Sequence, residues 1–462
     1  MVFSSLHFLF IFLPITLLAC WVLPGEGKNV ALLLASVFFY AWGEPVYVVL
    51  MLFSVAFNYV CGREIAALDA RGGRRKAALV FNVTVNLLIL GFFKYAGFLV
   101  ETINSVLSLN LSYAKLPLPI GISFYTFQAL SYVIDVYRRN VPAQKSFLRF
   151  AVYITMFPQL VAGPIVKYSD IKQQLEKRRM TLSSFGQGAE RLVRGLAKKV
   201  LLANNLGLLY TTIQAAPERS VLTAWLGMAA YTMQIYFDFS GYSDMAIGMG
   251  RMLGFSFLEN FNFPYVADSV TDFWRRWHMS LSGWFRDYVY IPLGGNRVSV
   301  AKHIRNLLVV WMLTGLWHGA SWNFVIWGLY YGVLLILEKY VFGSILERLP
   351  RVLSHLITLL LVGIGWVIFS NTEFPAMLAY LQNLFGVGTN GLADTAFLFY
   401  LRNNLVLLPV SLFCCLPLLR DLLHRHIARR PVSALCVYAA LFLVSVASLV
   451  YGSYNPFLYF RF

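Results

Sequence analysis

The stretch Phe273-Trp-Arg-Arg-Trp-His278 lies near the middle of a chain that is otherwise mostly apolar. A second polar stretch, Gly315-Leu-Trp-His318-Gly319, follows it after a loop and a further apolar run. Together the two stretches place arginines and two histidines between long hydrophobic segments. Ionisable side chains are costly at such positions and mark functional sites by default. These residues are therefore the first candidates for chemistry.

The rest of the chain has the composition of an integral membrane protein. Of its 462 residues 59% are hydrophobic and 13% are charged, whereas a typical soluble domain is about 25% charged. Apolar runs of roughly 17–25 residues, the length of a bilayer-crossing helix, recur along it. The pattern predicts an all-α polytopic membrane protein of roughly 11–13 transmembrane or re-entrant helices. No soluble domain or long linker interrupts it, so a single domain, 1–462, is expected.

The net charge of +17 also has a membrane explanation. A strongly basic soluble protein would suggest nucleic acid. Here the lysines and arginines lie in short loops beside apolar segments, which is the positive-inside pattern of membrane proteins. We therefore expect no nucleic acid partner. If these basic loops are cytoplasmic and the loops between them are external, the last span, about 432–451, runs outward. The aromatic tail, 452–462, is then expected on the outer face.

Two segments depart from simple spans. Phe157-Pro-Gln-Leu-Val-Ala-Gly-Pro164 has two prolines and a glycine inside an apolar run, which breaks a straight helix. Broken backbone at membrane depth must be covered by protein or line a cavity, so a bent or re-entrant element is expected. The polar region at about 255–323 combines arginines with tryptophans typical of membrane interfaces. It is expected to be partly submerged and to carry the catalytic residues.

Two acidic residues, Asp238 and Asp244, lie inside another apolar segment. Unpaired carboxylates would be costly there. Arg275 or Arg276 is the expected partner, either as a structural ion pair or as the lining of a polar tunnel. The sequence favours structural pairing.

His318 has the strongest case for chemistry. It lies roughly 20 Å along a helix beyond Arg305, at about 1.5 Å per residue, and therefore well inside the bilayer. Gly315 and Gly319 flank it and permit close approach of backbone or substrate. A neutral imidazole can take a proton from a hydroxyl group near neutral pH. The alternative is a buried histidine bonded to a neighbouring helix, and the residues alone do not decide between the two.

His278 and the turn after it give weaker signals. His278 can orient a second group or help to bind a donor, although an interfacial histidine among aromatic anchors is slightly favoured. Arg286, Asn296 and Arg297, with Gly294 and Gly295, make a glycine turn with basic flanks that suits phosphate or pyrophosphate, but a simple turn is favoured. The five cysteines show no metal spacing, so no metal site is expected.

The combination of motifs resembles the membrane-bound O-acyltransferase family, within it the bacterial branch that acetylates alginate, peptidoglycan and other polysaccharides. The resemblance rests on Trp274-Arg-Arg-Trp-His278, Trp284-Phe-Arg-Asp-Tyr288, Gly294-Gly-Asn-Arg297 and Gly315-Leu-Trp-His318-Gly319. Matching segments nearer the start, such as Leu118-Pro-Ile-Gly-Ile-Ser-Phe-Tyr125, extend it over nearly the whole chain.

The resemblance implies a fold and an active site. The helices would form a ring around a central funnel that thins the membrane barrier. His318 matches the catalytic histidine of the family, and His278 matches a second histidine of the bacterial branch. The acyl donor would be acetyl-CoA or another acyl thioester that enters from the cytoplasm, with no tightly bound cofactor. The residues expected to bind substrate are Trp274, Arg275, Arg276, Asn296, Arg297 and Trp317.

The tail adds an expectation about acyl relay. Phe457-Leu-Tyr459-Phe460 resembles the aromatic C-terminal motif of bacterial envelope acylation systems, in which a tyrosine is thought to carry the acyl group. His318 would be the base for the phenol of Tyr459, whose pKa is ordinarily about 10. An outer-face partner resembling an SGNH esterase would then load the polysaccharide. The alternative is an aromatic belt that anchors the last helix.

Two other functions remain possible at this stage. One is D-alanyl-type transfer to another envelope polymer, since the D-alanyl transfer proteins of teichoic acid are more distant members. The other is a non-enzymatic transporter of a lipid-linked or anionic substrate, because broken helices and buried charge suit transporters too. Inverted repeats would favour the transporter, and the sequence shows none. The expected location is the bacterial inner membrane, and the acceptor polymer stays open.

Overall fold

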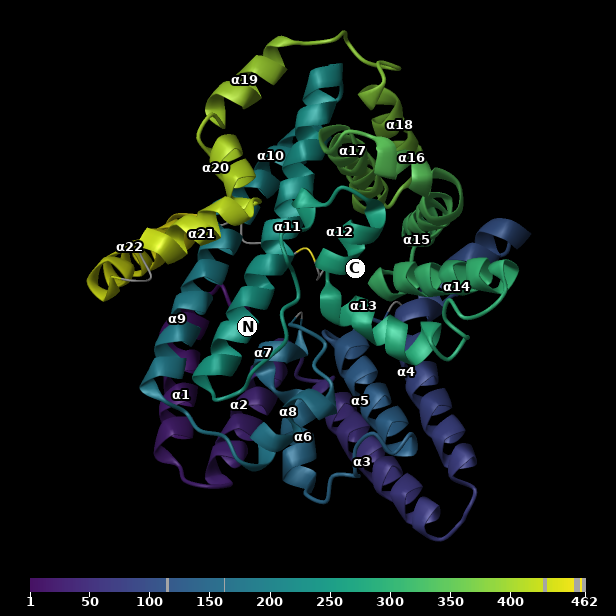
Figure 1. The fold of residues 1–462 in the computed structure, drawn as a ribbon, viewed down its shortest axis with the longest axis vertical. Coiled ribbons are helices and arrows are strands. Elements are labelled where there is room, and N and C mark those ends of the chain that lie inside the picture. Colours follow the sequence, from purple (N-terminus) through teal and green to yellow (C-terminus); the bar gives the residue numbers. More distant parts are fainter. Residues whose placement is uncertain (114–115, 162, 427–429, 453–457, 459–462) are drawn as a thin grey trace. The chain divides into compact units, whose positions relative to one another are not determined.

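The computed structural model describes residues 1–113, 116–161, 163–426, 430–452 and 458. These residues are helical or irregular and contain no β-strand (Figure 1). Five helices are long and apolar enough to cross a membrane, and a sixth is added if the bent pair α19 and α20 forms one span. The expected all-α polytopic class is confirmed. The larger number of spans and their ring around a funnel stay predictions.

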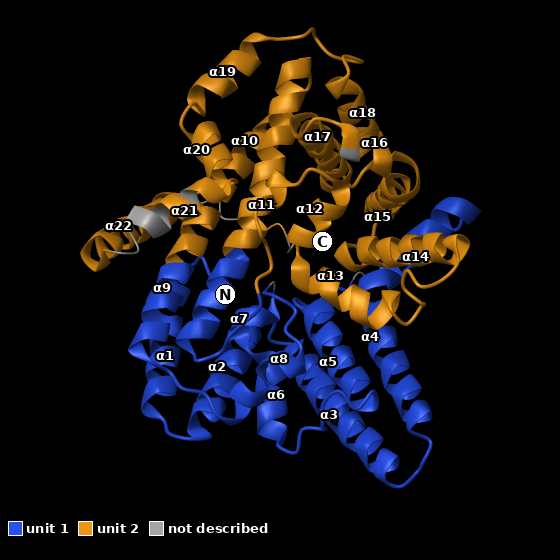
Figure 2. Cartoon of the chain, viewed as in Figure 1, with its two compact units in different colours: residues 1–192, 242–258 blue, residues 193–241, 259–462 orange. Residues whose placement is uncertain are grey.

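The described residues fall into two compact units (Figure 2). Unit 1 comprises Met1–Leu192 and Tyr242–Leu258, and unit 2 comprises Val193–Gly241 and Glu259–Phe462. Helices α9 and α11 contribute residues to both units. The sequence predicts a single domain, and this division into two units does not test that prediction.

Unit 1 contains the first helices of the chain. They are η1 (Phe8–Phe12), α1 (Leu13–Val22), α2 (Gly27–Gly43), α3 (Val48–Ala70), α4 (Arg75–Leu107), α5 (Ile122–Tyr137), α6 (Phe147–Thr155), α7 (Phe157–Leu160) and α8 (Tyr168–Glu176), with most of α9 (Leu182–Ala197) and the end of α11 (Val221–Met252). The expected break at Phe157-Pro158 is present, because α6 ends at Thr155 and α7 is a single turn. The backbone amide of Phe157 donates to Ser36 Oγ at 3.1 Å, which satisfies a donor freed by the break.

Unit 2 contains the candidate site. Its helices after α11 are η3 (Pro264–Val266), α12 (Val270–Arg276), α13 (Met279–Phe285), η4 (Arg286–Tyr290), α14 (Val300–His318), α15 (Trp322–Leu337), η5 (Glu338–Phe342), α16 (Gly343–Arg348), α17 (Arg351–Ser370), α18 (Phe374–Leu384), α19 (Thr395–Asn403), α20 (Leu407–Cys414), α21 (Pro417–His426) and α22 (Pro431–Tyr451). Before α11 come η2 (Lys198–Ala203) and α10 (Asn204–Ala215). Buried tryptophans from α12, α14, α15 and α17 form its aromatic core, namely Trp274, Trp311, Trp327 and Trp366.

The buried acids on α11 pair with residues that the sequence did not indicate. Within unit 2, Asp238 lies 2.6 Å from Lys199 Nζ. Within unit 1, Asp244 lies 2.6 Å from Arg191. The expected pairing with Arg275 or Arg276 is therefore wrong. Both observed partners belong to the continuous helical segment α9–η2, which precedes α11 in the chain and runs beside it.

Candidate active site

The first histidine, His278, lies at a turn where its own backbone is left-handed. His278 joins α12 to α13 with φ of +44°, a conformation that only a few per cent of non-glycine residues adopt. Asn260 fixes the turn from a neighbouring loop. Its carbonyl accepts the backbone amide of Met279 at 2.9 Å, and its side-chain oxygen accepts the Ser280 hydroxyl at 2.8 Å. The imidazole is thereby held in the interior, only 4% exposed.

Two glycines position the second histidine, because they let α14 and α15 touch backbone to backbone. A Cβ on Gly315 would lie 2.2 Å from the carbonyl oxygen of Phe324. A Cβ on Gly328 would lie 2.3 Å from the carbonyl oxygen of Trp311. His318, three residues beyond Gly315, is the last residue of α14. The expected close approach near His318 is confirmed, with the backbone of α15 as the partner.

Aromatic rings enclose His318. Its ring centroid lies 5.1 Å from that of Trp327 and 5.3 Å from that of Phe369, both nearly perpendicular to it. The side chain is 5% exposed. Trp317 contacts both histidines, with its ring 5.8 Å from that of His278 and 5.0 Å from that of His318. The two imidazoles therefore share one aromatic neighbour.

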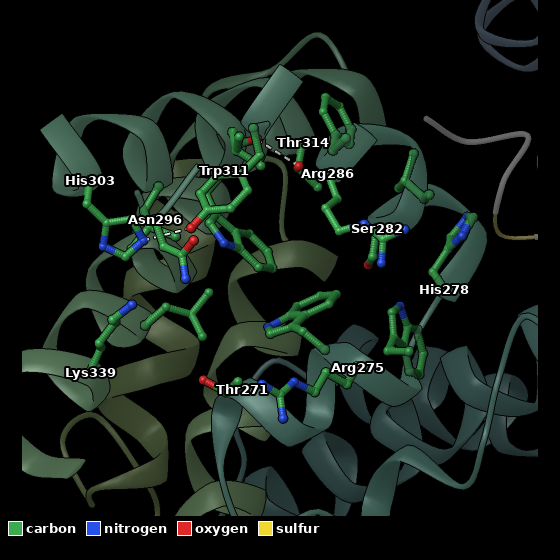
Figure 3. Close-up of a pocket in the computed structure, with 18 of the residues that line it drawn as sticks. Thr271, Arg275, His278, Ser282, Arg286, Asn296, His303, Trp311, Thr314 and Lys339 are labelled. Carbon is green, nitrogen blue, oxygen red and sulfur yellow. Dashed lines mark hydrogen bonds between the residues drawn. The ribbon is translucent and has the colours of Figure 1, made fainter. Parts of the chain in front are cut away.

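Both histidines line one cavity of about 400 Å³ in unit 2. Figure 3 shows residues that line this cavity, with His278 labelled among them. This volume is in the range of ordinary small-molecule sites. Most of the wall area is apolar, although polar side chains such as Thr271, Ser282 and Asn296 also line the cavity. Three cationic residues line the cavity, namely Arg275, Arg286 and Lys339. Among the described residues, no Asp or Glu lines it. The cavity is thus suited to an anionic or electron-rich ligand with an apolar portion.

One face of α14 forms a wall of this cavity. His303, Leu307, Val310, Thr314 and His318 recur at helical spacing, and all of them line it. His303 lies at the opposite end of that face from His318. Its ring nitrogens lie 2.8 Å from the Tyr290 hydroxyl and 2.6 Å from the Tyr340 hydroxyl. Burial and the nearby Lys339 lower the pKa of His303, so its imidazole is neutral near pH 7.

Sequence reasoning missed His303 and Lys339 as members of the site, and it considered Arg286 only as a basic flank of the glycine turn. It treated His303 only as a marker of the cytoplasmic end of the helix. The spacing from His303 to His318 was the available signal, because it places both histidines on one helical face. Lys339 carried no comparable signal, since it comes from another short helix, η5.

The structure brings together five of the residues expected to act in the site. Those that line the cavity are His318, His278, Trp274, Arg275 and Asn296. Arg276, Arg297 and Trp317 do not line it. Arg276 pairs with Asp272 at 2.8 Å, and the backbone of Arg297 closes the turn at Gly294, which has a φ of +102°. Tyr459 lies outside the described residues.

The charge state of His278 follows from its burial. The residue lies between two short helices, outside the candidate membrane spans. Burial lowers its pKa to about 4. The imidazole is therefore neutral near pH 7 and can accept or donate one hydrogen bond without adding charge to the cavity.

A pair of buried histidines beside cationic residues in a helical membrane scaffold suits proton transfer during an acyl transfer reaction. Residues 138–369 match the model of the MBOAT, membrane-bound O-acyltransferase family, and the chain belongs to that family. The match includes all the residues that line the cavity. The protein is therefore a multi-pass membrane acyltransferase, and the transporter alternative is set aside.

Named relatives narrow the comparison. The chain is 44% identical to the probable alginate O-acetylase AlgI of Pseudomonas aeruginosa, over 85% of this chain and 76% of that protein. It is 34% identical to the peptidoglycan O-acetyltransferase of Helicobacter pylori, over 85% of this chain and 81% of that protein. The teichoic acid D-alanyltransferase of Bacillus subtilis is more distant, at 29% over 64% of this chain and 85% of that protein.

Proposed function

We propose that this protein is an O-acetyltransferase of the bacterial inner membrane that supplies acetyl groups to a polysaccharide outside the cytoplasm. One observation carries the proposal: His278 and His318 line a single cavity whose charged lining is wholly cationic among the described residues. The names of the relatives that are 44% and 34% identical support an acetyl group and a polysaccharide acceptor over D-alanine.

The donor is acetyl-CoA, which reaches the cavity from the cytoplasm. Arg275, Arg286 and Lys339 suit the phosphate groups of such a donor, because charge-assisted hydrogen bonds to phosphate are strong. The apolar wall around Trp274 suits the thioester end. Asn296, which also lines the cavity, offers an amide to the same ligand.

His318 acts as the general base in the transfer. It removes the proton of an acceptor hydroxyl, whose oxygen attacks the thioester carbonyl carbon. The carbon–sulfur bond then breaks, and the proton passes from the imidazolium of His318 to the leaving thiolate. His278, neutral and held 5.8 Å from the shared Trp317 ring, orients the reacting groups. The acceptor hydroxyl is that of Tyr459, and an SGNH esterase-like partner on the outer face passes the acetyl group to the polymer.

Donor binding distinguishes two adjacent arginines. In vesicles supplied with labelled acetyl-CoA, Arg275→Gln is expected to raise the KM for the donor about tenfold, because one charge-assisted contact to phosphate is lost. Arg276→Gln is the matched control, since Arg276 pairs with Asp272 and does not line the cavity. Its KM is expected to stay within about twofold of wild type.

Two results would contradict this account of the donor. One is an equal rise in the KM for acetyl-CoA in both arginine variants, which would show that lining the cavity is not what makes Arg275 important for donor binding. The other is efficient transfer from a D-alanyl thioester with none from acetyl-CoA, which would favour the teichoic acid type of reaction.

The relay through the tail has its own test. Tyr459→Phe is expected to abolish transfer to the acceptor while donor binding is retained, because phenylalanine has no hydroxyl to acylate. Mass spectrometry of the wild-type tail peptide should detect acetyl-Tyr459. Tyr454→Phe, in the same tail, is the matched control and should remain active. A fully active Tyr459→Phe variant would exclude the relay.

A further inference from the structure

A buried ion pair in unit 2 has no part in the mechanism described above. Asp238 on α11 and Lys199 on η2 lie 2.6 Å apart, and their side chains are 1% and 4% exposed. Burying two charges costs several kcal/mol per ion unless the remaining lone pairs of the carboxylate are satisfied. The partner of the second carboxylate oxygen therefore bears on the role of this pair.

That partner comes from the far end of the chain. The backbone amide of Leu458 donates to Asp238 Oδ2 at 2.9 Å, across 220 positions of sequence. The Leu458 side chain is itself buried, 4% exposed. One carboxylate thus binds a cation through Oδ1 and the C-terminal segment through Oδ2. An amide bound to an ionised acceptor makes a stronger hydrogen bond than one bound to a neutral acceptor.

The helices around the pair are packed to make this contact. A Cβ on Gly241 would lie 2.8 Å from the carbonyl oxygen of Gly195 and 3.1 Å from the backbone nitrogen of Lys199. The absence of a side chain at Gly241 therefore lets the two helices approach at the level of Lys199 and Asp238. The final helix, α22, also packs against η2, so the element that carries Lys199 contacts the chain shortly before the tail.

The same part of α11 packs against the histidine site. The ring of Tyr236 lies 6.2 Å from Phe261 and 6.3 Å from Trp277. The ring of Phe261 in turn lies 6.2 Å from His278. Asp238, which accepts the Leu458 amide, is therefore two residues from Tyr236, and Tyr236 is connected to His278 in the cavity wall through the ring of Phe261.

We propose that the Lys199–Asp238 pair is the anchor of the C-terminal segment, and that Asp238 is a positioning residue for the tail. The anchor holds Leu458, the residue that precedes Tyr459 in the sequence, at a fixed place beside the histidine site. Lys199 binds one oxygen of the Asp238 carboxylate, and the other oxygen accepts the amide of Leu458. The anchoring is independent of the proposed acyl relay, whereas its effect on rate rests on that proposed function.

Hydrogen exchange of the full-length protein in detergent or nanodiscs tests the anchor. The Leu458 amide is expected to exchange at least about tenfold faster in Asp238→Ala than in wild type, the factor that a charge-assisted hydrogen bond supplies. Asp238→Asn keeps the shape and an oxygen acceptor but loses the charge, and should also exchange faster than wild type. It serves as the test variant if the alanine form does not fold.

Asp244→Ala is the matched control, because it breaks a different ion pair of α11, that with Arg191. Its Leu458 amide should exchange as in wild type. Equal exchange of that amide in wild type and in the Asp238 variants would overturn the proposal. Equal acceleration in Asp244→Ala would overturn it too, since it would reveal general loosening of α11.

A rate measurement separates the anchor from the relay. Asp238→Asn is expected to lower kcat for acetyl transfer about tenfold and to leave the KM for acetyl-CoA unchanged, because the donor site is intact. A rise in KM with unchanged kcat would contradict a positioning role. If the wild-type protein transfers no acetyl group, the proposed function fails, while the exchange experiment still decides whether the tail is anchored.

Discussion

Replacing His318 by alanine is expected to lower the rate of acetyl transfer by about 10²–10⁴-fold, the usual contribution of a general acid–base group. The expectation follows from position as well as residue type. His318 ends α14 at the wall of the cavity, and Trp327 and Phe369 enclose its ring. Initial rates in vesicles with labelled acetyl-CoA measure the effect.

His355→Ala is the matched control for His318→Ala. His355 is another helical histidine of unit 2, on α17, and its Nδ1 lies 2.9 Å from the carbonyl oxygen of Ala267. It does not line the cavity. The His355 variant should keep activity within a few-fold of wild type. Comparable losses in both variants would point to structural damage and would remove His318 from the mechanism.

The second large effect is expected at the glycine contact between α14 and α15. Gly315→Ala places a methyl group 2.2 Å from the carbonyl oxygen of Phe324, so the two helices must separate. Overpacking of this kind costs about 1–3 kcal/mol. Because His318 is one turn away, the shift also moves the base, and a misplacement of about 1 Å can cost about 10²-fold in rate. Thermal unfolding and initial rates should both report the change.

Gly328→Ala should behave in the same way, since its Cβ would meet the carbonyl oxygen of Trp311 at 2.3 Å. Gly91→Ala in α4 is the control, because nothing lies within 4 Å of its Cβ position. It should be neutral or slightly stabilising, as alanine is the better helix former. Full activity and an unchanged unfolding temperature in Gly315→Ala would show that the contact does not position His318.

The all-α membrane class could be predicted from the hydrophobic runs, and the two histidines could be selected as site candidates from the motifs around them. Both patterns involve residues that are close together in the sequence. The different roles of the two adjacent arginines could not be predicted in this way. Arg275 lines the cavity, whereas Arg276 pairs with Asp272 one turn earlier. Neighbouring residues point about 100° apart on a helix, and only the packing of α12 decides which one faces the ligand.

The partners of the buried acids were beyond local reasoning for a similar reason. Asp238 and Asp244 needed cations, and the nearest conspicuous ones in the polar region were Arg275 and Arg276. The true partners, Lys199 and Arg191, are determined by the packing of the α9–η2 segment along α11. Glycines such as Gly241 permit that packing, but a lone glycine in a helical pattern does not indicate which helix packs against it.

The cavity itself depends on tertiary packing. Its wall combines α12, α13, η4, α14, α15 and η5, which meet only in the folded unit. The face of α14 from His303 to His318 was readable from helical periodicity, yet its function as a cavity wall was not. Lys339 was identified as a site residue only from the packing of these helices.

In the proposed mechanism the donor meets the catalytic base in the cavity lined by His278 and His318. Donor affinity and single-turnover acetyl transfer, measured together in His318→Ala, test this assignment. We expect the Kd for acetyl-CoA to stay within about threefold of wild type while the transfer rate falls by about 10²-fold or more. Transfer at the wild-type rate, or a loss of transfer fully explained by loss of donor binding, would contradict the account.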